Sequence, residues 1–155
     1  PAALFRNYDF GHHDAYVSVE HQLGESFCAD YMLLGKNSLG YHIVLVEFEN
    51  ANVDYRLKNS CGESESVRKG LVQIRDWKCW MDENRSYFLG RPGTRDICNN
   101  IPSWGINYCL VVSRRDKMDE KANKMRRITS GEIRGLKIVT YDRLIDNVRQ
   151  LSNGF

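Results

Sequence analysis

The chain lacks several features that define large classes of protein. No two of its five cysteines have C-x-x-C spacing, their number is odd, and no continuous apolar run is long enough to cross a membrane. These absences argue against a structural zinc site, a secreted disulfide framework and a transmembrane helix. The first residues also lack the architecture of a signal peptide, so we expect a cytoplasmic protein with no membrane partner. Cys79 and Cys109 lie in apolar periodic segments, and we expect both to be buried.

The chain also lacks a strong net charge, because its formal value is only +2 at neutral pH. This balance neither requires nor excludes a nucleic-acid partner. Positive charge is nevertheless concentrated in the segment 117–127, directly after Arg114 and Arg115. A solvated helix face explains such a segment, and so does a surface that contacts phosphates of DNA. We assign the second role to Lys121, Lys124, Arg126 and Arg127.

Size and composition indicate one globular domain over residues 1–155. A chain of 155 residues with 42% hydrophobic and 27% charged content has enough apolar residues for one core and too few for two. The sequence starts at Pro1 with no Met before it, from which we expect the C-terminal part of a longer protein. The adjacent His12 and His13 point in different directions on a helix or strand, so we do not expect them to share a metal.

Apolar runs and turn residues predict alternating strands and helices. A strand or short helix is expected over 15–19; the expected strands are 30–35, 41–49, 107–113 and 136–141, and two expected helices are 117–128 and 141–151. A longer helix is expected after Ser60 or Ser64, with Ser60 and Glu63 in the spacing of a capping box. Its buried stripe is Val67, Leu71, Ile74, Trp77 and Met81. This order predicts an α/β fold with a mixed sheet flanked by helices.

Three carboxylates stand at the ends of two neighbouring apolar strands. Asp30 opens the first strand, and Glu47 and Glu49 lie near the end of the second. Because side chains alternate along a strand, Glu47 and Glu49 share one face. A turn over 37–40 would fold Asp30 back towards Glu47. Carboxylates grouped in this way favour a hard cation such as Mg²⁺ or Mn²⁺, although solvated strand ends would give the same spacing.

The order of motifs along residues 17–150 resembles the nuclease domain of the Shedu family of bacterial anti-phage proteins. The motifs are E-x-x-L-G at 20–24, Asp30-Tyr31, the acidic strand with Glu47 and Glu49, Q-x-x-x-W at 73–77, and the T-Y-D-x-L segment at 140–144. The spacing of Asp30 and Glu47 also resembles the PD-(D/E)XK nuclease pattern, in which an acid precedes an acid-x-Lys triplet.

The resemblance implies a PD-(D/E)XK restriction-endonuclease-like fold and Mg²⁺-dependent hydrolysis of phosphodiester bonds in DNA, specifically phage double-stranded DNA. It implies that Asp30, Glu47 and Glu20 hold the metal and that Gln73 has a role at the site. It further implies self-association into a homo-oligomer, with specificity set by an N-terminal region outside this sequence.

Glu49 departs from the nuclease pattern, because Lys is usual at its position. Three interpretations stay open. The acid-x-acid triplet is active as it stands, or Lys69 on the following helix supplies the missing positive charge, or the domain is a catalytically inactive DNA-binding or oligomerisation module. A nuclease that acts on RNA is a further alternative.

Overall fold

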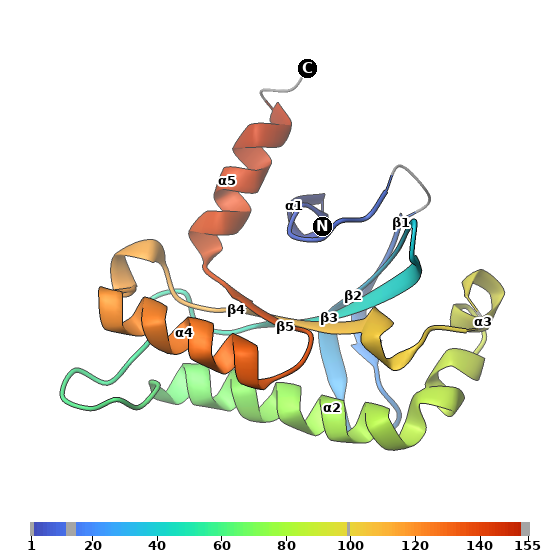
Figure 1. Ribbon diagram of the computed structural model, residues 1–155, viewed down its shortest axis with the longest axis horizontal. Helices are drawn as coiled ribbons and strands as arrows, with labels where there is room; N and C mark the ends of the chain where they lie inside the picture. The colour runs from blue at the N-terminus through green and yellow to red at the C-terminus, as the bar shows by residue number, and fades with distance from the viewer. Residues whose placement is uncertain (1, 12–14, 99, 153–155) are drawn as a thin grey trace.

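The computed structural model describes residues 2–11, 15–98 and 100–152, so His12 and His13 lie outside the described residues. Within these ranges the protein contains five strands and five α-helices (Figure 1). The strands are β1 (Ala15–Gln22), β2 (Cys28–Asn37), β3 (Gly40–Phe48), β4 (Ile106–Val111) and β5 (Leu136–Val139). The helices are α1 (Ala2–Phe5), α2 (Glu65–Gly90), α3 (Thr94–Ile97), α4 (Glu120–Glu132) and α5 (Tyr141–Ser152), with short 3-10 turns at Ser103–Gly105 and Arg115–Lys117.

The strands form one mixed sheet in the order β1-β2-β3-β4-β5. The first three strands are antiparallel, whereas β3 and β4, and β4 and β5, are parallel. Parallel neighbours require a crossover, which α2 supplies between β3 and β4 and α4 supplies between β4 and β5. The predicted α/β class with a mixed, helix-flanked sheet is confirmed.

Helices cover both faces of the sheet, with α2 and α4 on one face and α1 and α5 on the other (Figure 1). The cluster under α2 contains Leu45 and Leu110, and the cluster on the opposite face contains Val46 and Val111. All five residues of the predicted α2 stripe are buried, including Trp77. The strand and helix periods were therefore assigned correctly.

Three local predictions are wrong. The helix α2 begins at Glu65 with Ser64 as its N-cap, which confirms the alternative start after Ser64, but Ser60 and Glu63 form no capping box; Glu63 instead pairs with Arg56 in a β-bridge. Cys79 is exposed, because it lies on α2 away from the buried stripe. The basic helix begins at Glu120 and not at 117, because the Asp119 carboxylate accepts the backbone N–H of Ala122 and caps the helix there.

Within the described ranges, no helix is both long enough and apolar enough to span a membrane.

Candidate functional site

The hairpin register brings Asp30 and Glu47 together. Tyr31 pairs with Val46 across the antiparallel strands β2 and β3, so Asp30 and Glu47 occupy the next opposing positions. The Asp30 carboxylate accepts a hydrogen bond from the backbone N–H of Phe48 at 2.7 Å, which fixes its orientation beside Glu47. The two acids therefore lie side by side at the carboxyl end of β3, as the sequence predicts.

Glu47 is a buried acid in an unfavourable environment. Its residue is only 6% exposed, and its Oε2 atom finds no hydrogen-bond partner among the described residues. The pKa of Glu47 is raised to about 8, mainly by burial and also by the nearby charges of Asp30 and Glu49, while Lys69 opposes them. A buried carboxylate is costly unless a cation or a proton compensates its charge. This position therefore favours a positive ligand.

Glu49 and Lys69 form an ion pair next to this acid. Glu49 extends from the end of β3 and is buried, and its Oε1 lies 3.3 Å from the Lys69 Nζ atom of α2. The lysine side chain is 70% exposed, so its ammonium group reaches the buried acid from solvent. The backbone of Glu49 is held in place as well, because its carbonyl accepts a hydrogen bond from the Tyr141 hydroxyl at 2.7 Å.

Helix α2 approaches the acids closely because it has no side chain at Gly70. A Cβ atom there would lie 2.5 Å from Leu110 Cδ1 and 3.0 Å from Glu49 Cγ. The glycine thus allows contact between α2 and the strands β3 and β4, and it positions the preceding residue, Lys69, at the acid pair. The sequence contains this signal as a glycine inside an apolar helical stripe, which often marks a close approach.

Glu20 and Gln73 occupy the border of the site. Glu20 lies opposite Asp30 in the register of β1 and β2, is exposed, and has a positive φ of 49°. Gln73 lies one turn after Lys69 on α2 and lines a surface hollow of about 490 Å³ together with Cys28. Sequence reasoning did not select Cys28 for this site. Burial raises the pKa of its thiol, and the charges of Glu20, Asp30 and Glu47 raise it further.

The acids offer a partial coordination set. Among the described residues, no group of three or more His, Cys, Asp or Glu side chains is arranged to hold a metal ion. Mg²⁺, however, is commonly held by one or two carboxylates, with water and substrate phosphates as its other ligands. The Asp30 and Glu47 pair, with the unpartnered Glu47 oxygen, meets that requirement.

The four basic residues assigned to DNA lie on α4, apart from the acids, and they line two different hollows. Lys121 and Lys124 line a hollow of about 470 Å³ together with Arg56 and Cys61 from the 56–63 segment. Arg126 and Arg127 line a second hollow, beside strand β5. The four residues therefore do not all line one hollow, and their contact with DNA stays a prediction.

Comparison with protein-family models identifies the family of this chain. The model of the family described as "Shedu protein SduA, C-terminal" matches residues 2–145, which is nearly the whole chain. No curated protein matches the sequence. The match includes every acid of the site, the helix that carries Lys69, and the segment that carries Tyr141. The chain belongs to the Shedu SduA C-terminal family.

Proposed function

We propose that this domain is a Mg²⁺-dependent endonuclease of the PD-(D/E)XK type that hydrolyses phosphodiester bonds in DNA. The observation that carries the proposal is Glu47, a buried carboxyl with an unpartnered oxygen, placed opposite Asp30 and next to the Glu49–Lys69 ion pair. Acids and a cation gathered at the end of one strand match the composition of a phosphoryl-transfer site.

The arrangement of strands supports the same assignment. Three antiparallel strands, a crossover helix and two parallel strands follow one another, and the acids lie on the strand where the two halves of the sheet meet. Family membership implies a role in defence against phage, so we propose phage double-stranded DNA as the substrate.

In this proposal Asp30 and Glu47 hold the cation, the Phe48 carbonyl adds a ligand, and Glu20 approaches from the neighbouring strand. A bound Mg²⁺ would polarise the scissile phosphate and stabilise the leaving oxygen. The Phe48 N–H keeps the Asp30 carboxylate oriented for this role.

Lys69 takes the part that a lysine at position 49 would have in the usual motif. Its side chain is 70% exposed and its ammonium group is held by Glu49, so it could orient the attacking water and offset negative charge on the phosphate. Glu49 then positions Lys69 and need not bind the metal. This geometry favours the Lys69 interpretation, while direct participation of Glu49 remains the alternative. Gln73, on the next turn of α2, would contact the substrate at the edge of the site.

The proposal is tested with Glu47→Ala. We expect this variant to keep its thermal stability and to lose cleavage of double-stranded DNA by at least about 10²-fold in Mg²⁺. The matched control is Glu83→Ala, the same change at an exposed position of α2, which should cleave normally.

Two results would contradict the proposal. Normal cleavage by Glu47→Ala would remove the acid from the mechanism, and absence of cleavage by the parent chain in Mg²⁺ and Mn²⁺ would favour the inactive DNA-binding or oligomerisation module. RNA substrates assayed in parallel separate an RNA nuclease from the DNA nuclease proposed here. Size-exclusion chromatography with light scattering tests the proposed homo-oligomer.

A further inference from the structure

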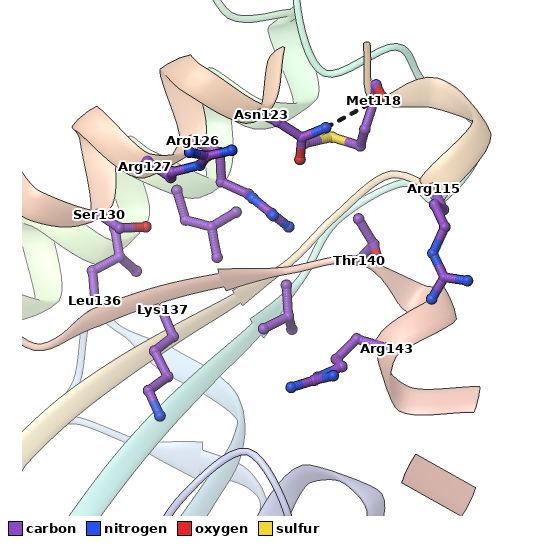
Figure 2. A pocket seen from close by; sticks show the side chains of 12 residues that line it. Arg115, Met118, Asn123, Arg126, Arg127, Ser130, Leu136, Lys137, Thr140 and Arg143 are labelled. Carbon is purple, nitrogen blue, oxygen red and sulfur yellow. Dashed lines mark hydrogen bonds between the residues drawn. The ribbon is translucent and has the colours of Figure 1, made fainter. Parts of the chain in front are cut away.

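A basic hollow lies on the opposite side of α4 from Lys121 and Lys124. It has a volume of about 640 Å³ and lies between α4, the edge strand β5 and the start of α5 (Figure 2). We call it the β5 hollow. Its lining residues include Arg115, Arg126, Arg127, Lys137 and Arg143, and none of its lining residues is Asp or Glu.

Two of the five cations already have partners. Arg115 pairs with Asp146 of α5 at the rim of the hollow. The Lys137 ammonium lies 4.4 Å from the centre of the Tyr8 ring and donates a hydrogen bond to the Asn7 carbonyl. These two cations therefore have partners within the protein and do not require a ligand.

The other three cations are the guanidinium groups of Arg126, Arg127 and Arg143. Across the residues that the structure describes, none of the three forms an ion pair with a carboxylate. Figure 2 shows Arg126 and Arg127 on α4 and Arg143 on α5, with the edge strand β5 between the two helices. Three guanidinium groups around one hollow make it strongly attractive to an anion.

Arg126 carries a partly buried positive charge. The residue is only partly exposed, and this burial lowers the pKa of its guanidinium. The neighbouring Tyr55 raises that pKa, and Arg127 lowers it. Partial burial of a charge without an opposite charge costs free energy, which a bound anion would recover. The position of this charge therefore favours binding of an anion from outside the protein.

The remaining lining groups suit a phosphate. Ser130 and Thr140 contribute hydroxyls, whereas the Asn123 amide already donates to the Met118 and Asp119 carbonyls at 3.4 and 3.1 Å. Planar guanidinium groups bind two phosphate oxygens at once, which makes arginine the preferred residue for such ligands. A volume of about 640 Å³ lies in the range of small-molecule pockets.

We propose that the β5 hollow is a phosphate-binding site in which Arg126, Arg127 and Arg143 hold the anion. The phosphate belongs either to the backbone of a nucleic acid or to a free nucleotide, and both present the same chemistry. Thr140 lines the hollow, and the next residue, Tyr141, donates its hydroxyl to the Glu49 carbonyl. A ligand in the hollow therefore contacts a segment that is bonded directly to the acidic strand. The proposal does not depend on cleavage activity.

Two binding measurements on the full chain in metal-free buffer test this proposal. Calorimetry with inorganic tripolyphosphate measures a free ligand, and fluorescence anisotropy with a labelled DNA duplex measures backbone phosphate. The test variant is Arg127→Gln/Arg143→Gln, which changes two exposed residues. The matched control is Arg75→Gln/Arg149→Gln, which removes the same charge from exposed positions that do not line the hollow. Thermal unfolding of each variant confirms that the fold is kept.

We expect the test variant to weaken binding of at least one probe by about tenfold or more, and the control to change tripolyphosphate binding by less than about twofold. If the test variant loses affinity for tripolyphosphate alone, the hollow is a free-nucleotide site. If it loses affinity for the duplex, the hollow binds backbone phosphate. Equal affinities for the parent and the test variant, or an equal loss in the control, would overturn the proposal. Glu47→Ala should retain this binding, so failure of the nuclease assignment would remain distinguishable.

Discussion

At the scale of single residues, the ionised carboxylate of Glu47 is unfavourable at the end of β3. Its carboxyl is buried, faces Asp30 and Glu49, and has a pKa raised to about 8. An unfolded chain returns the same group to water, where its pKa is near 4.5. The difference between the two states makes the stability of the metal-free protein dependent on pH.

We therefore expect the free energy of unfolding to decrease as pH rises from about 5 to 8 in metal-free buffer. In that window the folded protein retains the Glu47 proton and the unfolded chain has released it, so each step in pH favours unfolding until the folded group also ionises. Glu47→Gln should remove this contribution and should be more stable than the parent above pH 8. Urea unfolding at several pH values measures the effect. The same dependence of the free energy of unfolding on pH in parent and variant would contradict it.

Lys69 is the residue through which the candidate mechanism differs from the usual motif. Lys69→Met should reduce DNA cleavage by about 10²-fold or more, because it removes the positive charge nearest to Glu49 and Glu47. The same change at Lys78, which pairs with Asp82 elsewhere on α2, is the control and should leave cleavage unchanged. The exchange Glu49→Lys/Lys69→Glu moves the lysine onto the strand and should restore part of the activity. Full activity of Lys69→Met would leave Glu49 as the remaining explanation.

At the scale of elements, the position of α2 against the sheet depends on Gly70. Alanine usually stabilises a helix interior by about 1 kcal/mol relative to glycine, but overpacking a buried contact costs about 1–3 kcal/mol. Gly70→Ala would place its Cβ 2.5 Å from the fully buried Leu110 side chain, so we expect a net loss of about 1 kcal/mol.

Gly90→Ala is the matched control for this prediction, because a Cβ at the end of the same helix meets no atom within 4 Å. It should be neutral or slightly stabilising. Gly70→Ala should also reduce cleavage, since a shift of α2 separates Lys69 from Glu49. Chemical denaturation and cleavage assays measure the two effects, and a Gly70→Ala variant more stable than the parent would show that the contact is not tight.

The same elements show which parts of the site are predictable from sequence. The pairing of Asp30 with Glu47 follows from strand period and a short turn, both of which are local properties. The start of α2 was not predictable from Ser60 and Glu63, because the 56–63 segment pairs with itself through Arg56 instead of continuing the helix. The contact of Lys69 with Glu49 depends on how α2 packs against the sheet; Gly70 indicates a close approach there but does not identify the residue that Lys69 meets.

At the scale of the whole molecule, the proposed binding to DNA would depend on the local distribution of charge, because the net charge is only +2. Family membership does not locate the contact. The structure places four cations of α4 on two sides of the helix, two beside the 56–63 segment and two beside β5. A duplex that meets this helix would contact phosphates from both pairs or from one pair alone.

We expect a variant with Lys121, Lys124, Arg126 and Arg127 all changed to Gln to bind every DNA sequence more weakly than the parent. Each cation that contacts a phosphate releases about one counterion, so the slope of log affinity against log salt should become shallower by about 0.9 for each such residue. Fluorescence anisotropy over a salt series, with metal omitted to prevent cleavage, measures this slope.

The control for this prediction removes the same charge elsewhere, by changing the exposed Lys58, Arg75, Arg95 and Arg149 to Gln. Both quadruple variants lower the net charge equally, so a general electrostatic effect would weaken binding in both. A shallower slope in the α4 variant alone would place the phosphate contacts on that helix. Equal slopes for the parent and the α4 variant would instead mean that α4 is a solvated face, and DNA would then have to meet the acids from another side.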